Sequence, residues 1–412
     1  MSNLENSMMN KKSFSRRNFV KSSFAVAGIG LIGNSPLYGD DCPVDALNAP
    51  GPIPLNDILS DYMETDKKFG RGLSKVTICD KDNWENKRLS ILRRSRLMLG
   101  EEPPVNEDTI KTDVLAENQR NGYTELKIQF PSGTGDTIKG YLLIPDGVTA
   151  SSPHPAIVAM HSTGPGATQT VGLTPKENRC YGMELAQRGY VVLAIDTISA
   201  GERVYPGYEP YYTNEFYNQY PNWSAMDKMI FDHKRGLDYL CSLDIVDPNR
   251  LGCIGHSLGG YNSFFLHAFD TRIKAAVSSC GFSPMGRTNK PYQFARGDWF
   301  VHFNPDCRDY IRAGMIPCDM HEVMALCAPR PLFNYSGKKD AIYSMASAQK
   351  DNGFAEWWKT VDEALNQVSR IYEISGAANH FVRIDGEGGH DFPPDVKDEA
   401  YRWLDKWLKD SI

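Results

Sequence analysis

The sequence lacks the patterns that mark several common classes of protein. It has no apolar stretch of about 20 residues, so we expect no permanent membrane span. It has no Cys-x-x-Cys pair, no helix motif with two zinc-binding histidines and no glycine-rich nucleotide fingerprint, so we expect neither a metal nor a cofactor. Its formal net charge is −6 and no basic block follows the N-terminal region, which argues against a nucleic-acid partner.

The cysteine content and the length leave the disulfide pairing and the number of domains open. The nine cysteines are an odd number, so at least one thiol is unpaired in a monomer. Cys307, Cys318 and Cys327 fall within one loop-rich region and could include a disulfide. A chain of 412 residues with 41% hydrophobic and 23% charged residues is typical of a globular protein, and it can hold one large α/β domain with extensions or two domains. The oligomeric state is left open.

Residues 1–35 have the pattern of an export signal. A basic region that ends in Arg16 and Arg17 precedes a weakly apolar segment, residues 22–33, which is too short to remain as a span. The stretch around the two arginines resembles the twin-arginine signal of bacteria, and an ordinary secretory signal with two adjacent arginines is the alternative. Either signal predicts an exported protein, periplasmic or extracellular, and we exclude this segment from the fold.

Residues 36–120 are predicted to be a linker followed by a helical N-terminal extension. Residues 36–56 are rich in Pro, Gly, Asn and Asp, as linkers are. We predict a short helix over residues 55–69 and an amphipathic helix over residues 84–99, which Gly100 and the proline pair after it would end. The arginines of the second helix are expected to form a solvated face.

Residues 121–412 are predicted to form one domain of the α/β class. A strand of period two at residues 123–130 and a second strand at 138–144 form an antiparallel hairpin. Beyond it, short apolar runs alternate with helical segments, which indicates a mainly parallel sheet with the hairpin at its N-terminal edge and helices on both faces. The predicted strands are 156–160, 190–195, 251–255, 273–278, 331–335 and 380–384, and the predicted helices are 177–188, 224–243, 261–268, 355–368 and 396–408.

Two long segments, residues 197–223 and 282–328, interrupt the alternation of strands and helices. Loops of such length in a compact domain are usually functional or covering elements. Both follow the carboxyl ends of predicted strands, where open α/β sheets bind ligands. The first contains six tyrosines, which suit either stacking on sugars and aromatic acyl groups or the simple packing of a lid.

The stretch Gly255-His256-Ser257-Leu258-Gly259 is the strongest functional motif in the chain. A short apolar run precedes it and a helix-compatible segment follows, which is the strand–turn–helix context of a nucleophile elbow. The turn around such a serine is so tight that side chains two residues to either side would collide, and Gly255 and Gly259 remove those collisions. Ser257 is therefore the predicted nucleophile.

A serine nucleophile needs a base and an orienting acid, and after an elbow they follow in the order acid, then histidine. His390 lies in a glycine-rich loop after the last predicted strand and is the leading base, while His380, just before that strand, is the alternative. Asp340 follows an apolar strand and a glycine turn, so it is the predicted acid, although an aspartate there could also cap a helix. Asp391 is a neighbour of His390 in sequence, which makes it an awkward acid for that ring.

Two backbone N–H groups are predicted to form an oxyanion hole. One is that of Leu258, directly after the nucleophile, and the other is that of Ser162 or Thr163, in the turn after the third strand. Three further residues are candidates for contact with the substrate, namely His161, Glu202 and Arg203. Each has a structural alternative, because the histidine could hold its own turn and an ion pair of the other two could hold the long loop.

Together these motifs resemble the α/β-hydrolase superfamily, and within it the dienelactone-hydrolase-like and acetylxylan-esterase-like branch. The resemblance spans residues 120–410 and rests on residues 161–164, the elbow, the turn that ends in Asp340 and the glycine-rich loop before His390. It implies a serine hydrolase that cleaves esters through an acyl-enzyme. The nucleophile is a serine where dienelactone hydrolases use cysteine, and the Arg-Gly-Gln-Gly loop of the acetylxylan esterases is replaced by Ser199-Ala200-Gly201-Glu202-Arg203.

The sequence thus supports the hypothesis of an exported bacterial serine esterase that acts on a carbohydrate ester, such as an acetyl or methyl ester of a plant polysaccharide. The expected partner is a small-molecule or oligosaccharide ester. A prolyl-oligopeptidase-like peptidase is one alternative, although the region before residue 120 is too short for the propeller that such enzymes usually carry. A catalytically silent binding protein on a hydrolase scaffold is another, and the complete triad argues against it.

Overall fold

The computed structural model describes residues 53–67, 70–105, 110–176, 178–287, 300–344 and 353–410. The predicted export signal and most of the predicted linker lie outside these residues. The described chain belongs to two compact units, of which the smaller takes in residues 62–76 and the larger residues 44–61 and 77–412. None of the described helices combines the length and the apolar character that crossing a membrane requires.

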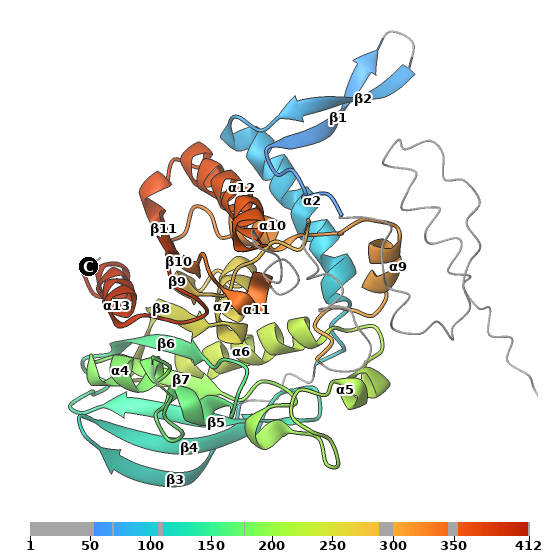
Figure 1. The fold of residues 1–412 in the computed structure, drawn as a ribbon. Coiled ribbons are helices and arrows are strands. Elements are labelled where there is room, and N and C mark those ends of the chain that lie inside the picture. The colour runs from blue at the N-terminus through green and yellow to red at the C-terminus, as the bar shows by residue number, and fades with distance from the viewer. Residues whose placement is uncertain are drawn as a thin grey trace, which may run out of the picture. The chain divides into compact units, whose positions relative to one another are not determined.

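The described part of the small unit is a two-stranded sheet of β1 (Ser60–Lys67) and β2 (Gly70–Thr77), shown in Figure 1. The prediction of a helix over residues 55–69 is therefore wrong. Just before β1, the side chain of Asp57 accepts hydrogen bonds from the N–H of Leu59 and the hydroxyl of Ser60. Such local bonds from an aspartate offer the backbone an alternative to a helix, so the chain turns here instead.

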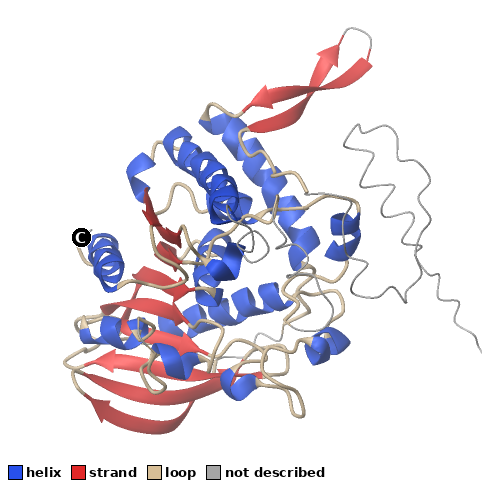
Figure 2. Ribbon diagram, in the orientation of Figure 1, coloured by secondary structure: helices blue, strands red, loops and turns tan. Residues whose placement is uncertain are grey.

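A nine-stranded sheet forms the centre of the large unit (Figures 1 and 2). Its strands follow the order β11-β10-β9-β8-β6-β7-β5-β4-β3. The strands from β11 to β7 run parallel to one another, whereas β5, β4 and β3 are joined antiparallel. Their bounds are β3 (Asp113–Arg120), β4 (Tyr123–Pro131), β5 (Thr137–Pro145), β6 (His154–Met160), β7 (Val191–Ile195), β8 (Val246–His256), β9 (Ile273–Ser279), β10 (Leu332–Gly337) and β11 (Phe381–Gly386).

The predicted α/β architecture is confirmed, with one change at the edge of the sheet. The predicted antiparallel hairpin is present as β4 and β5, but β3 pairs with β4 and is the outermost strand. All eight residues of β3 are exposed, so no buried face imposes an alternation of apolar and polar side chains on it. That is why hydrophobic periodicity does not reveal this strand.

Two hydrophobic cores, one on each face of the sheet, hold the helices in place. In β7, Val191, Leu193 and Ile195 join one core, while Val192 and Ala194 join the other. Side chains alternate along a strand, so a strand covered on both faces needs an unbroken apolar run. The first core includes α2 (Lys81–Leu99), α6 (Ala225–Cys241), α7 (Leu258–Phe269), α10 (Met320–Ala325) and α12 (Gly353–Ile374), and the second includes α3 (Ala167–Thr170), α4 (Tyr181–Gln187) and α13 (Pro394–Leu408).

The two insertions contain short helices. Residues 197–223 hold the 3-10 helix η2 (Gly201–Arg203) and α5 (Asn214–Gln219), and the described part of residues 282–328 holds α9 (Cys307–Arg312) and α10. The cysteines of the second insertion, Cys307, Cys318 and Cys327, are buried free thiols. The disulfide considered for this region is therefore not formed.

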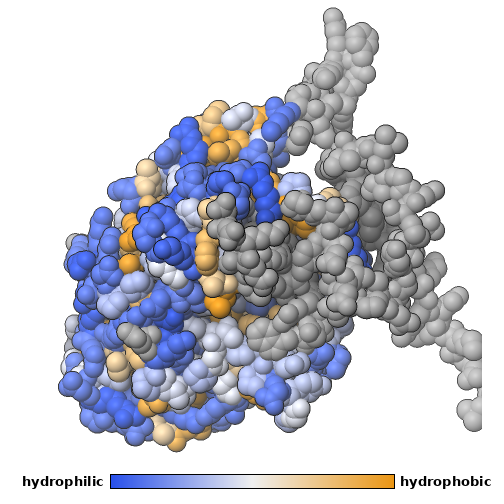
Figure 3. Space-filling view, viewed as in Figure 1, coloured by the Kyte–Doolittle hydropathy of each residue, from blue (hydrophilic) through white to orange (hydrophobic). Residues whose placement is uncertain are grey.

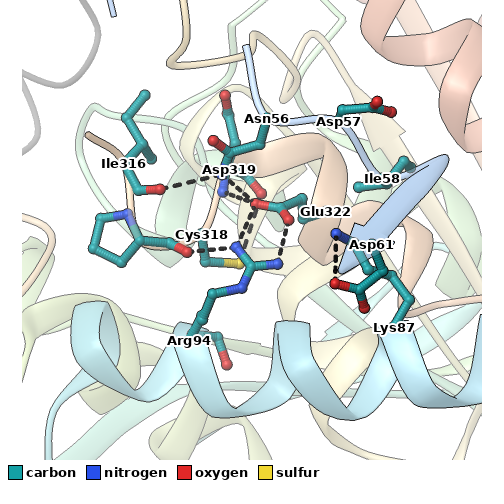
Figure 4. Close-up of polar contacts among 12 residues, drawn as sticks. Asn56, Asp57, Ile58, Asp61, Lys87, Arg94, Ile316, Cys318, Asp319 and Glu322 are labelled. Carbon is teal, nitrogen blue, oxygen red and sulfur yellow. Dashed lines mark hydrogen bonds and ion pairs between the residues drawn. The ribbon is translucent and has the colours of Figure 1, made fainter. Parts of the chain in front are cut away.

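Helix α2 docks on the second insertion through buried charges, as Figure 4 shows. Arg94 pairs with Glu322 of α10 at 2.6 Å, and Asn56 donates to the same carboxylate at 2.5 Å. Burial alone would raise the pKa of Glu322, but the charge of Arg94 brings it down to about 2. Arg96, whose side chain is about half exposed, pairs with the buried Asp227 of α6 at 3.1 Å, but here burial dominates and raises the pKa of Asp227 to about 6. The prediction of a solvated face is therefore wrong for Arg94, whereas Arg96 keeps its side chain half exposed. Both arginines reach buried carboxylates and fasten the helix to the sheet domain.

The side of the large unit seen in Figure 3 is mainly hydrophilic, with apolar residues scattered over it. The large exposed apolar side chains of the described chain are Leu89, Val114, Leu115, Leu173, Tyr208 and Ile342. Only the two on the edge strand β3 are neighbours in sequence. Scattered apolar side chains are ordinary on protein surfaces, so we assign no interaction surface to them.

Candidate active site

A nucleophile elbow lies at the end of β8. Ser257 joins β8 to α7 with φ 58° and ψ −117°, a strained conformation for a residue other than glycine. A Cβ on Gly255 would collide with the backbone of Gly259, and a Cβ on Gly259 would collide with the carbonyl oxygen of Met160. Glycine at both positions lets β6, β8 and α7 approach closely enough to hold the strained turn.

Three predicted side chains meet at this turn. Ser257 Oγ lies 2.8 Å from His390 Nε2, and His390 Nδ1 lies 2.6 Å from Asp340 Oδ2. Asp340 follows β10 and His390 follows β11, so the carboxyl ends of parallel strands bring all three groups to one edge of the sheet. The alternative base, His380, lies at the opposite end of β11, where its Nδ1 contacts the carbonyl oxygen of Pro329 at 2.7 Å.

These contacts define the tautomer of the imidazole. An ionised carboxylate can only accept, so the Nδ1–H of His390 donates to Asp340, and Nε2 is left to accept the hydroxyl proton of Ser257. The other oxygen of Asp340 accepts the N–H groups of Ile342 and Tyr343 at 2.9 and 3.0 Å. The two roles weighed for this aspartate, helix cap and partner of the histidine, therefore coexist because they use different oxygens.

Backbone hydrogen bonds join the turn that ends in Asp340 (residues 337–340) to the loop that carries the base (residues 386–391), called the histidine loop below. The N–H groups of Lys338 and Lys339 donate to the carbonyl oxygens of Gly386 and Gly388 at 2.8 and 2.9 Å. A Cβ on Gly337 would collide with the backbone of the same loop. Small residues on both sides thus let the histidine loop fold back over the end of β10.

The buried Arg179, which lies outside the histidine loop, forms hydrogen bonds to it. Arg179, just before α4, donates to Asp391 Oδ1 at 2.7 Å and to the carbonyl oxygen of His390 at 3.4 Å. Asn178 donates to the other carboxylate oxygen of Asp391 at 2.9 Å. Burial alone would raise the pKa of Asp391, but the hydrogen bonds from Arg179 and its neighbours hold it below the ordinary value. Sequence reasoning missed Arg179, since its partner is 212 residues away.

The predicted oxyanion donors lie on the two segments that flank the serine. Leu258 opens α7, so its N–H has no carbonyl oxygen within the helix to bond. Ser162 and Thr163 lie in the turn after β6, and their N–H groups form no hydrogen bond with the rest of the described chain. The hydroxyl of Ser162 donates to the carbonyl oxygen of His256 at 3.2 Å, which ties this turn to the residue before the nucleophile.

His161 is occupied within the same turn. Its ring is buried, its Nδ1–H donates to the carbonyl oxygen of Ser162 at 2.8 Å, and its Nε2 accepts the N–H of Thr197 at 3.0 Å. Burial lowers the pKa of His161, which keeps the ring neutral and able to accept that bond. Both nitrogens are used inside the protein, so the histidine holds its own turn and offers neither nitrogen to a substrate.

Arg203 and Glu202 are also engaged within the protein. The buried guanidinium of Arg203 pairs with Asp136 at 2.6 Å and with Asp232 at 2.8 Å. Glu202 pairs with Lys127 of β4 at 2.5 Å. These ion pairs hold the start of the first insertion, and no contact joins either side chain to the triad residues within the described chain.

Cys280 lies beside the three triad residues and raises the question of a metal. Its sulfur, a carboxylate oxygen of Asp340 and a ring nitrogen of His390 lie within 4.8 Å of one another. Burial raises the pKa of the Cys280 thiol to about 12, and the thiol contacts the carbonyl oxygen of Asp391 at 3.2 Å. A thiol that stays protonated is a poor metal ligand, and both imidazole nitrogens are already bonded. The arrangement therefore suits proton transfer better than metal binding.

Comparison with known proteins gives this fold a family. The model of the prolyl oligopeptidase family matches residues 181–411, which is more than half of the chain. The protein named "Putative hydrolase YtaP" of Bacillus subtilis (strain 168) is 26% identical over 323 residues, or 77% of this chain and 99% of that protein. The 4-O-methyl-glucuronoyl methylesterase 1 of Wolfiporia cocos (strain MD-104) is 24% identical over 206 residues, or 46% of this chain and 47% of that protein.

A solved structure shares the fold of this chain. The glucuronoyl esterase from Solibacter usitatus is similar with a TM-score of 0.60 at 19% identity, over 86% of this chain and 97% of that chain. At this identity the similarity shows the fold alone. The α/β-hydrolase resemblance seen in the sequence motifs is confirmed by the family match. The chain therefore belongs to the prolyl oligopeptidase family and is a serine hydrolase of the α/β-hydrolase fold.

Proposed function

We propose that this protein is an exported esterase that hydrolyses carboxylic esters of a carbohydrate through an acyl-enzyme. The observation that carries the proposal is the unbroken path from Ser257 Oγ to His390 at 2.8 Å and from His390 to Asp340 at 2.6 Å. We assign Ser257 as the nucleophile, His390 as the general base and Asp340 as the acid that orients the imidazole.

In the first half-reaction, Ser257 Oγ attacks the carbonyl carbon of the ester while His390 Nε2 takes the hydroxyl proton. Asp340 keeps Nδ1 protonated and stabilises the positive charge that the ring gains. The carbonyl oxygen becomes an oxyanion, for which we assign the N–H of Leu258 and that of Ser162 or Thr163 as donors. Collapse of this intermediate breaks the bond to the alcohol oxygen, and the alcohol leaves with the proton held by His390.

In the second half-reaction, His390 takes a proton from a water molecule, whose oxygen adds to the acyl carbon. The same N–H donors hold the second oxyanion. Collapse then breaks the bond between the acyl carbon and Ser257 Oγ, and the serine regains its proton from the imidazole. The products are a carboxylic acid and the free alcohol.

Two considerations support a carbohydrate ester as the substrate. The relative from Wolfiporia cocos is named for methyl esters of a glucuronoyl group, and the solved structure from Solibacter usitatus is named for glucuronoyl esters. We therefore place esters of sugar acids ahead of acetyl esters of sugar hydroxyls. The export signal predicted at residues 1–35 fits a polymer that is met outside the cytoplasm.

The test measures the methanol and acetate released from a panel of plant polysaccharides, which includes methyl-esterified uronates and acetylated xylan. We expect release by the wild type and a turnover at least about 10⁴-fold lower for Ser257→Ala. Activity confined to small aryl or lipid esters would sink the carbohydrate part of the proposal. Activity that survives in Ser257→Ala would overturn the assignment of the nucleophile.

Peptide hydrolysis is the second candidate, because the matching family is named for prolyl oligopeptidases. The same triad would serve, since amide and ester cleavage share a tetrahedral intermediate. Against it, the relative from Wolfiporia cocos and the solved structure from Solibacter usitatus are both named as esterases. We expect a far larger kcat/KM for para-nitrophenyl acetate than for a prolyl-peptide amide. The reverse order would favour the peptidase.

A further inference from the structure

The two long insertions contact each other at Tyr211 and Phe300. The N–H of Phe300 donates to the carbonyl oxygen of Tyr211 at 2.9 Å, and the two ring centroids lie 5.0 Å apart. The N–H of Tyr211 donates to the carbonyl oxygen of Ser199 at 2.7 Å, within the first insertion. Both aromatic residues are buried. Tyr211 is thus held by backbone hydrogen bonds to both insertions, through Ser199 in the first and Phe300 in the second.

The hydroxyl of Tyr211 binds the turn that follows β6. It accepts the N–H of Gly164 at 2.7 Å and donates to the carbonyl oxygen of the same residue at 2.8 Å. One hydroxyl therefore restrains the peptide groups on both sides of Gly164. The bond also occupies the N–H of Gly164, which leaves those of Ser162 and Thr163 as the donors this turn can offer.

A second path of hydrogen bonds leads from Phe300 to helix α7. The carbonyl oxygen of Phe300 accepts the Nδ1–H of His302 at 2.8 Å, and His302 Nε2 contacts the hydroxyl of Tyr261 at 2.5 Å. Since Nδ1 donates to a carbonyl oxygen, Nε2 accepts the proton of Tyr261. Tyr261 belongs to α7, the helix whose first N–H is that of Leu258. The two segments with the proposed oxyanion donors are therefore connected through Tyr211 and Phe300.

The backbone at this junction is strained. Tyr211 has φ 69° and Phe300 has φ 44°, in the left-handed region that bulky residues rarely adopt. Such conformations persist only where the surroundings over-determine them, and they cluster at functional sites. Here the surroundings are the hydrogen bonds just described, which hold both residues where a relaxed backbone would not place them.

We propose that Tyr211 is a positioning residue of the oxyanion hole, which sets the turn of residues 162–164 relative to α7. The proposal rests on the proposed function in one respect, the use of Ser162 or Thr163 as the second donor, and it does not depend on the sugar. Donors act only within about 2.7–3.1 Å of the developing oxyanion, and loss of one costs about 10²–10³-fold in kcat. A donor that is held less firmly should lose only part of that effect, so we expect kcat to fall about tenfold when Tyr211 loses its hydroxyl.

The test compares Tyr211→Phe with wild type on para-nitrophenyl acetate. The variant keeps the ring and loses only the hydroxyl, so kcat should fall about tenfold while KM changes less than about twofold, as expected for an interaction made in the transition state. The matched control is Tyr217→Phe in the same insertion. Its hydroxyl also accepts a backbone N–H, from Ala225 at 3.1 Å, and donates to the carbonyl oxygen of Val301 at 3.0 Å. The control should leave kcat within about twofold of wild type.

A transition-state mimic gives a readout that a general loss of stability does not move. An aryl trifluoromethyl ketone forms a tetrahedral adduct with Ser257, so its affinity should fall in Tyr211→Phe by the same factor as kcat/KM. Unchanged kcat and affinity in Tyr211→Phe, or equal losses in Tyr217→Phe, would overturn the proposal.

A second variant covers the case in which Tyr211→Phe does not fold. Tyr261→Phe breaks the path one step further away, and we expect a loss of kcat of about two- to fivefold with the same pattern toward the ketone. No loss in Tyr261→Phe would then count against the proposal. Wild type that cleaves the aryl ester but no polysaccharide would refute the proposed substrate and leave the role of Tyr211 intact.

Discussion

The carboxylate of Asp391 lies 2.7 Å from the buried guanidinium of Arg179, directly next to the proposed base in the chain. The pair joins the loop after β11 to the segment before α4. The histidine loop contains Gly386, Gly388 and Gly389, which supply little stiffness of their own. The ion pair therefore provides a restraint that the glycine-rich backbone lacks.

Asp391→Asn is expected to lower kcat about tenfold on para-nitrophenyl acetate, because a base displaced by a fraction of an ångström no longer meets the serine hydroxyl. The substitution keeps the shape of the side chain and leaves Arg179 without its charged partner. Asp405→Asn is the matched control, since Asp405 pairs with Arg188 at 2.7 Å at the far end of α4. Equal kcat values for the two variants would show that the Arg179 pair does not position the base.

Asp340→Asn is expected to lower kcat about 10³–10⁴-fold with little change in KM. The amide can present an N–H to His390 Nδ1, which favours the tautomer with the proton on Nε2, where the base must be free. Steady-state kinetics on the aryl ester measures the loss. Asp385→Asn, which removes a carboxylate bound to Arg383 at the end of β11, should retain near-wild-type kcat. A mild loss in Asp340→Asn would mean that another group orients the imidazole.

Cys280 is expected to be chemically inert although it adjoins the triad. Burial raises the pKa of its thiol to about 12, so little thiolate is present near pH 8. Iodoacetamide should label the exposed Cys79 in the folded protein and leave Cys280 unmodified, as peptide mass spectrometry would show. Cys280→Ala should keep kcat within about threefold of wild type. Rapid labelling of Cys280 with loss of activity would point to a direct chemical role for the thiol.

Glu322→Gln is expected to destabilise the protein by about 3 kcal/mol at pH 7, because it breaks a buried ion pair with Arg94. The pKa of Glu322 falls from 4.5 to about 2 on folding, so the folded state keeps the charge where the unfolded chain takes up a proton. The stabilisation is thus complete above pH 4.5 and is lost as the pH falls toward 2.

Thermal unfolding of wild type and Glu322→Gln at pH 7 and near pH 3 checks this dependence, and the difference in stability should be smaller at the lower pH. Glu363→Gln is the control, since its pair with Arg287 is half exposed and should contribute little at either pH. A difference that stays constant between the two pH values would contradict the pairing of Glu322 with Arg94.

Local rules predicted the elements that a buried face or a tight turn dictates. The apolar run of β7 is readable because both faces of that strand are covered, and the elbow is readable because only glycine fits beside Ser257. The exposed strand β3 and the Asp57 turn before β1 have no such constraint. Periodicity therefore did not reveal the strand, and helix propensity wrongly placed a helix over residues 55–69. Arg94 shows the same limit, since a helix sequence does not reveal which of its charges will meet a buried carboxylate.

The sequence by itself determined the α/β class and the chain order of Ser257, Asp340 and His390, because both follow from spacing along the strands and turns that carry them. Only the tertiary structure decided what holds these groups in register. Arg179 reaches Asp391 across 212 residues and Tyr211 reaches Gly164 across 47, and both bonds exist because distant loops are brought to the same edge of the sheet. Such partners are close only in the folded state, so no local pattern in the sequence predicts which residues will pair.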